Sequence, residues 1–303
     1  METSSMAAAA QSPQAAGAGP APRRKKNSAL RRLVRHRLAL FGVAVILFLV
    51  LACSIGPLLL PFDDTTVDIL ARFSGPLSGA HVLGTDQLGR DMLARLLMAG
   101  RISLAVGFGS MILSMIIGVL IGVIAGYYGG VVGAVLMRFV DAVLCFPIIF
   151  LLLALAAFIK PSVGSIIFLL AATGWMEVAR IVEGQIRSLR ERDYAVAALA
   201  LGAGDGRIMF KELLPNAVAP IVVSATLNVA YAILMESYIS FLGYGIQPPT
   251  PSWGNMLGGA QSYLESAPWL AILPGVMIAL AVTSINFIGD GLRDALDPRV
   301  EVQ

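Results

Sequence analysis

Six long apolar stretches constrain the fold of this chain more than any other feature. A helix needs about 20 predominantly apolar residues to cross the hydrocarbon core of a bilayer. The stretches that reach or approach this length are Leu38–Leu60, Ile102–Tyr127, Met137–Ile159, Val163–Ala179, Ala217–Ser240 and Trp269–Ile288. The fourth is the shortest and the most polar. The sequence therefore predicts an all-α membrane protein with six transmembrane helices.

Composition supports a bilayer as the solvent. Of the 303 residues, 57% are hydrophobic and only 14% are charged, and the mean hydropathy is +0.80. A soluble domain has roughly a quarter of its residues charged. The chain lacks a polar surface large enough to cover its apolar mass in water, so membrane lipid is an expected partner.

Lysine and arginine counts predict the orientation of the spans. An even number of spans places both termini on one side of the membrane. Seventeen of the 22 Lys and Arg residues then lie in segments on the side of the N-terminus, and five lie in the opposite segments. Positive loops stay in the cytoplasm. Both termini are therefore expected to be cytoplasmic.

The chain divides into three parts. Residues 1–37 combine a low-complexity stretch with a basic block, and they are predicted to form a disordered cytoplasmic tail that anchors the first span. Nucleic-acid binding is the weaker interpretation of this block. Residues 38–101 hold the first transmembrane helix and an outer loop, and residues 102–303 hold a five-helix core with a cytoplasmic loop at about 180–215.

The segment "DYAVAALALGAGDGRIMFKELLPN", residues 193–216, is polar yet rich in alanine and glycine. A helix over 179–201 is predicted to end at Gly202, where a left-handed residue without Cβ is favoured. Asp205 is expected to cap a short second helix, Pro215 to end it, and Asn216 to cap the fifth span. Two interpretations stay open for the small side chains: close packing against helices of the same chain, or docking into a cleft of a cytoplasmic partner.

Several residues inside the spans are expected to have special roles. Gly118, Gly122 and Gly126 form a ladder of small residues that lets another helix, from this chain or from a sister subunit, approach closely. Asn228 and Glu236 are eight residues apart and share a helix face, which predicts a polar stripe on a translocation path. The alternative for Glu236 is that its side chain reaches the outer membrane surface.

No catalytic, cofactor or metal site is predicted. The sequence has no phosphate-binding loop with its lysine, no nucleophile turn and no paired His/Glu spacing. Cys53 and Cys145 lie in apolar runs and are expected to be small buried hydrophobes. The chain is therefore not expected to be an enzyme or to hold nucleotide.

The spacing of Ala197, Ala198 and Gly202, followed by Leu214–Pro215, resembles the "EAA" loop of binding-protein-dependent ABC importer permeases. The blocks "LGTDQLGRDMLARLL" (83–97), "SFLGYGIQPPTPSWGNML" (240–257) and "FIGDGLRDALDPR" (287–299) resemble the C-type permease of dipeptide, oligopeptide and nickel importers. The resemblance covers residues 33–300. It implies the type I ABC importer permease fold in a bacterial inner membrane.

The resemblance also implies partners and sites. The partners would be a homologous B-type permease, two ATPase subunits that bind ATP and Mg, and an extracytoplasmic peptide-binding protein. The ATPase-coupling residues would be Ala197, Ala198, Gly202, Ala203, Asp205, Arg207, Leu214 and Pro215. The loop departs from the family pattern at Val196, where the motif has glutamate.

Two further expectations concern function. Pro248, Pro249, Pro251 and Trp253 are expected either to dock the binding protein or to shape the outer loop. The function implied is a permease subunit for ATP-driven import of dipeptides or oligopeptides. The alternative is a self-contained channel or secondary transporter for small solutes.

Overall fold

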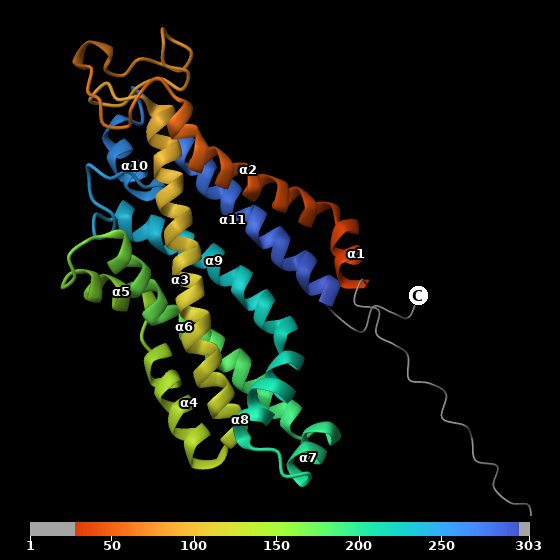
Figure 1. Ribbon diagram of the computed structural model, residues 1–303. Coiled ribbons are helices and arrows are strands. Elements are labelled where there is room, and N and C mark those ends of the chain that lie inside the picture. Colours follow the sequence, from red (N-terminus) through yellow and green to blue (C-terminus); the bar gives the residue numbers. More distant parts are fainter. Residues whose placement is uncertain (1–27, 297–303) are drawn as a thin grey trace, which may run out of the picture.

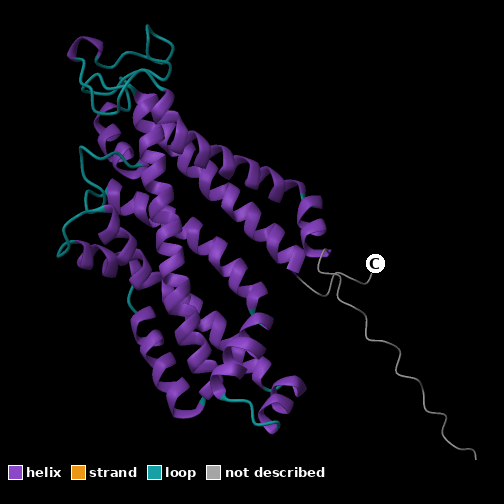
Figure 2. Cartoon of the chain, in the orientation of Figure 1, coloured by secondary structure: helices purple, strands orange, loops and turns teal. Residues whose placement is uncertain are grey.

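The chain is an all-helical bundle over the residues that its computed structural model describes, 28–296, with loops at the two ends and along one side (Figure 2). The α-helices are α1 (Ser28–Arg35), α2 (Arg37–Leu59), α3 (Met92–Tyr128), α4 (Gly130–Leu144), α5 (Ile148–Ala156), α6 (Val163–Arg190), α7 (Asp193–Ala200), α8 (Asp205–Arg207), α9 (Val218–Phe241), α10 (Trp253–Ala260) and α11 (Trp269–Leu296). A 3-10 turn covers Ile69–Ala71, a π-helical turn Ile208–Leu213, and further 3-10 turns Leu214–Asn216 and Gln261–Tyr263.

Within residues 28–296, five helices are long and apolar enough to cross a membrane: α2, α3, α6, α9 and α11. The third predicted span, Met137–Ile159, is not one helix. It is broken into α4 and α5, whose axes differ by 82°. Pro147 stands at the break as the N-cap of α5, because it has no N–H for a continuing helix and disfavours helical geometry at Phe146. The predicted membrane fold is confirmed at the level of an all-helical protein with five such helices, or six if the bent pair is one span.

The N-terminal boundary also differs from the prediction. Residues 28–35, which were expected to belong to a disordered tail, form α1. α2 then begins at Arg37, where His36 accepts a hydrogen bond from the amide of Ala39 at 3.1 Å. The rest of the predicted tail, residues 1–27, and the last seven residues, 297–303, lie outside the described part of the chain.

The glycine ladder packs α3 against α6. A Cβ on Gly118 would lie 2.7 Å from the carbonyl oxygen of Trp175, and one on Gly122 would lie 2.6 Å from that of Ala179. One on Gly126 would lie 2.7 Å from the carbonyl oxygen of Glu183. The two backbones approach too closely for any side chain. Of the two predicted uses of the ladder, the structure shows packing within this chain.

The other helices flank this pair. α9 packs against α3, α6 and α11, and α2 lies beside α11 (Figure 1). Both described ends of the chain lie together, because α1 contacts α11. The 193–216 segment lies at one end of the bundle, lowest in Figure 1. This end of the bundle is called the segment end below. The loops at residues 60–91 form a cap at the opposite end, the cap end.

The cap is held by a buried carboxylate. Asp86 accepts hydrogen bonds from the amides of Leu88 and Arg90, at 2.8 and 3.0 Å. Its Oδ2 lies 2.7 Å from Nη2 of Arg90 and 3.4 Å from Nε of Arg95, at the start of α3. Buried charges persist in proteins when they are paired in this way. The network therefore fixes the cap on the end of α3.

Candidate functional site

The 193–216 segment is a helix, a tight turn and a short second helix, broadly as predicted. The predicted single helix over 179–201 is interrupted, because α6 ends at Arg190 and α7 begins at Asp193. Gly202 has a φ of +78°. The amides of Gly202 and Ala203 donate to the carbonyls of Leu199 and Ala198, at 2.9 and 3.0 Å. This is the Schellman arrangement that ends a helix with a left-handed residue, so the role predicted for Gly202 is confirmed.

One side of the segment is anchored in the bundle. Ala195 of α7 is buried, as are Ile208, Met209 and Leu213 of the following turns. They form one apolar cluster with Val182 and Ile186 of α6 and Val123 of α3. The 193–216 segment is therefore attached to the α3–α6 pair by a hydrophobic contact.

The other side of α7 is exposed and apolar. Val196, Leu199 and Leu201 are 54%, 60% and 88% exposed. Ala197, between them, is exposed as well, while Ala198 and Ala203 are half-buried. Partial burial raises the pKa of the Tyr194 hydroxyl, so this neighbouring group stays uncharged. Apolar side chains gathered on a protruding polar segment are typical of a protein-binding surface.

Asp205 does not cap a helix as predicted. Gly204 is the N-cap of α8 and makes no side-chain capping bond. The Asp205 carboxylate instead accepts hydrogen bonds from the hydroxyls of Tyr127 and Tyr128, at 2.7 and 3.2 Å. The guanidinium of Arg190 donates to the carbonyl of Tyr127. These four side chains, called the tyrosine clamp below, tie the segment to the ends of α3 and α6.

The remaining residues predicted for the site lie around the clamp. Arg207 is exposed, and its Nε lies 3.8 Å from Oε1 of Glu212. Leu214 and Pro215 form a 3-10 turn before α9. Asn216 donates to the carbonyl of Glu212 at 2.6 Å and does not cap α9, contrary to expectation. A cleft of about 380 Å³ lies between the clamp and α7, and Val196 and Leu199 line it.

Sequence reasoning missed the tyrosine clamp. Tyr127 and Tyr128 lie more than 70 residues before Asp205, and only the fold brings them together. The available signal was the pair of hydroxyl-bearing aromatic residues directly before Gly129–Gly130, where α3 ends.

Removing the clamp is expected to loosen the segment without unfolding the bundle. In a Tyr127→Phe/Tyr128→Phe double variant, amide hydrogen exchange over α7 should become roughly three- to ten-fold faster, because two hydrogen bonds to a carboxylate are lost. Tyr194→Phe is the matched control, since its hydroxyl has no hydrogen-bond partner within residues 28–296. Equal exchange in all three proteins would show that the hydrophobic contact alone holds the segment.

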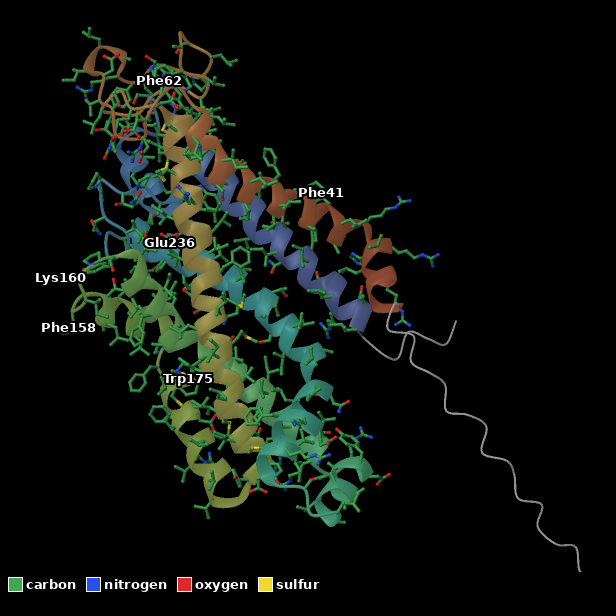
Figure 3. The ribbon with its side chains drawn as sticks, in the orientation of Figure 1. Phe41, Phe62, Phe158, Lys160, Trp175 and Glu236 are labelled. Carbon is green, nitrogen blue, oxygen red and sulfur yellow. The ribbon has the colours of Figure 1, made fainter. Side chains whose placement is uncertain are left out.

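Glu236 lies inside the protein, and the alternative in which it reaches the outer surface is wrong (Figure 3). Its side chain is 0% exposed. Its carboxylate accepts hydrogen bonds from Ser103 of α3 at 2.9 Å and from Ser240 of α9 at 2.7 Å. The Ser103 hydroxyl also accepts from the amide of Trp253 at 3.2 Å. Glu236 thus links α9 to α3, and Ser103 extends the network to the start of α10.

Asn228, the other residue of the predicted stripe, is half-buried. Its side chain donates to the carbonyl of Gly174 at 3.4 Å, so it bridges α9 and α6. Ser110 and Ser114 of α3 and Ser237 of α9 are buried without a hydrogen-bond partner in the described part of the chain. The stripe therefore consists mainly of contacts between helices.

The outer proline segment is only partly exposed. Pro248 and Pro249 are exposed, whereas Pro251 is buried. Trp253 is 0% exposed, and its indole N–H donates to the carbonyl of Leu96 at 3.1 Å. Trp253 thus anchors α10 to α3, and its predicted place on a docking surface is incorrect for this structure.

Comparisons with known proteins identify the family. Residues 118–302 match the family of binding-protein-dependent transport system inner membrane components. The chain belongs to that family. Residues 27–76 of this permease match the N-terminal transmembrane domain of oligopeptide transport permease C. It is thus a multi-pass protein of the bacterial inner membrane.

Similar curated proteins cover nearly the whole permease. A putative peptide permease protein of Brucella suis is 43% identical over 273 residues, which is 89% of this chain and 90% of the relative. A dipeptide transport system permease protein of Alkalihalophilus pseudofirmus is 40% identical, over 90% of each chain. A di/tripeptide transport system permease protein of Pseudomonas aeruginosa is 39% identical, over 87% of this chain and 88% of the relative.

Proposed function

We propose that the permease is the C-type membrane subunit of an ATP-driven importer of dipeptides or oligopeptides. The names of the similar proteins support peptide as the substrate class. The match of residues 27–76 supports the C-type assignment. The excess of Lys and Arg in alternate segments supports a cytoplasmic location for both termini and for the segment end.

The observation that carries the proposal is the exposed apolar face of α7. Val196, Leu199 and Leu201 project from a segment that the hydrophobic cluster and the tyrosine clamp hold to α3 and α6. An ATPase subunit that binds this face gains a mechanical contact with two long helices. ATP and Mg bind to the two ATPases, and this chain needs no nucleotide site of its own.

The mechanism follows from that attachment. ATP binding closes the ATPase pair and displaces α7. The clamp and the buried face of α7 carry the displacement to α3 and α6, which the glycine ladder holds as one unit. The bundle then tilts against the homologous B-type permease, between states open to either side. A ligand-driven change of this kind requires that the α7 contact differ between two states of the ATPase.

Val196 replaces the acidic residue of the family motif with an apolar one. It lies beside Leu199 in the cleft near the clamp, so the side chain adds to the apolar face. The coupling contact at this position is therefore hydrophobic. At the cap end, Pro248 and Pro249 remain the exposed candidates for contact with an extracytoplasmic binding protein.

Reconstitution tests the proposal. Liposomes that hold this chain, the B-type permease and both ATPases should accumulate a labelled di- or tripeptide when the binding protein and ATP are supplied. Liposomes with this chain alone should neither hydrolyse ATP nor take up peptide. Uptake by the chain alone would establish a channel or secondary transporter instead.

A further inference from the structure

A groove runs between α6, α9 and α11 at the segment end. Its volume is about 450 Å³. The residues that line it are Ile181 and Gln185 of α6, Ala219, Pro220, Val223, Ser224 and Leu227 of α9, and Arg293 and Leu296 of α11. The groove is apolar along most of its length, with a few polar groups.

Glu177 lies on α6 just beyond the residues that line the groove, nearer the middle of the helix. It precedes Ile181 and Gln185 by four and eight residues, so the three share one face of α6. The Glu177 side chain is exposed, and Tyr231 lies one turn beyond Leu227 on α9. No ion pair or hydrogen bond to Glu177 occurs within residues 28–296.

An exposed carboxylate at this place requires a polar environment. Glu177 lies within the apolar stretch that predicts the fourth span. Ionisable side chains in such stretches face a partner or a water-filled path and rarely face lipid. No group on the described helices is bonded to Glu177, so its carboxylate is available to a cationic ligand.

A positive charge lies at the other end of the groove. Arg293 is exposed, and it has no ion-pair partner among the described residues. Along α6, Glu177 and Gln185 are separated by roughly 12 Å, at about 1.5 Å per residue, and Gln185 lines the groove together with Arg293. An extended chain covers about 3.3–3.6 Å per residue, so roughly three or four residues span this separation.

We infer that this groove is a peptide-binding surface on the cytoplasmic half of the translocation path. The carboxylate of Glu177 accepts hydrogen bonds from the peptide ammonium group, and the guanidinium of Arg293 binds the terminal carboxylate. The apolar residues of the groove between Glu177 and Arg293 contact the side chains of the peptide without selecting among them. This inference rests on the proposed function, and it adds two residues that fix the direction in which a short peptide lies.

A cysteine-labelling experiment tests the inference. Gln185→Cys is introduced with Cys145→Ser, since Cys53 is buried and Cys145 is exposed. The complete transporter is studied in inside-out vesicles, so that peptides and a membrane-impermeant thiol reagent reach the groove without the binding protein. Phe168→Cys is the control, because Phe168 is exposed on α6 two and a half turns before Glu177 and hence on the opposite face.

The groove cysteine should react, and the control should not. A free tripeptide at saturating concentration should slow the reaction roughly three- to ten-fold, the size expected for one or two charge-assisted hydrogen bonds. N-acetylation of the peptide should remove most of this protection. The Glu177→Gln substitution should remove as much of the protection by free peptide as acetylation does. In that variant, free and acetylated peptide should protect the cysteine equally.

Two results would overturn the inference. Failure of Gln185→Cys to react in the complete transporter would show that another subunit covers the groove. If the cysteine reacts at the same rate with free peptide, with acetylated peptide and without peptide, the groove binds no peptide. Either result alongside normal ATP-driven uptake would leave the proposed function intact, whereas absence of uptake in the unaltered transporter would reject that function first.

Discussion

Gly202→Val is expected to reduce ATP-driven peptide uptake more than ten-fold while the permease still reaches the membrane. The left-handed conformation costs an L-residue about 1–2 kcal/mol, and a β-branched residue disfavours it further. Gly202 has a φ of +78°, and the space around its Cβ position is empty. The strain is therefore confined to the backbone. We expect the last turn of α7 to rearrange and to move Leu199 and Leu201 away from the ATPase.

Gly204→Val is the matched control for this prediction. Gly204 lies two residues further along, with φ −71° and ψ 153°, a conformation that valine favours, and its Cβ position is also open. Both variants should be compared for uptake at equal amounts of membrane protein, and for copurification of the ATPases. Normal uptake with Gly202→Val would show that the end of α7 does not position the ATPase contact.

Gly122→Leu should prevent stable folding of the permease. A Cβ at this position would lie 2.6 Å from the carbonyl oxygen of Ala179 and 2.7 Å from Cβ of Val182, so α3 and α6 would have to separate. Overpacking by a few atoms typically costs about 1–3 kcal/mol, and here the obstacle is backbone. Stability of a domain is only about 5–15 kcal/mol, so a large share would be lost.

The control for Gly122→Leu is Gly184→Leu. Gly184 lies on α6, in the same helix pair, but its Cβ position has no neighbour within 4 Å. Thermal unfolding in detergent and the amount of protein in the membrane are the measurements. The Gly122 variant should be nearly absent from the membrane or should unfold well below the parent protein, whereas the Gly184 variant should match it. Similar unfolding temperatures for both variants would contradict the packing role of the ladder.

Local patterns in the sequence predicted local structure well. Six apolar stretches predicted six long helices, and five of them are present, whereas the third stretch is broken into α4 and α5. Gly202 was predicted from its neighbours alone, since a helix end of this type involves only residues within six positions. The ladder at Gly118, Gly122 and Gly126 predicted a close approach, because the spacing itself puts the three residues on one helix face.

The failures concern partners that are distant in sequence. Asp205 has the sequence context of a helix cap, but Tyr127 and Tyr128 compete for its carboxylate. Glu236 was expected to face the surface or a path, and it bonds to Ser103, 133 residues earlier. Trp253 follows a proline-rich outer segment, yet its indole is buried against α3. The packing of α3 beside α8, α9 and α10 decides these outcomes, and the periodicity of the sequence carries no information about that packing.

The shared hydroxyl of Ser103 limits how the outer half of the permease moves. It donates to Glu236 on α9 and accepts from the amide of Trp253, which is the first residue of α10. Lifting α10 from the bundle would break the bond from the Trp253 amide to Ser103 and the bond from the Trp253 indole to Leu96, in an apolar interior where unpaired polar groups are costly. α10 therefore travels with α3 and α9 as a single body. For the proposed importer, we therefore expect solute to enter at the cap end by tilting of the whole bundle, and we do not expect α10 to open as a hinged flap.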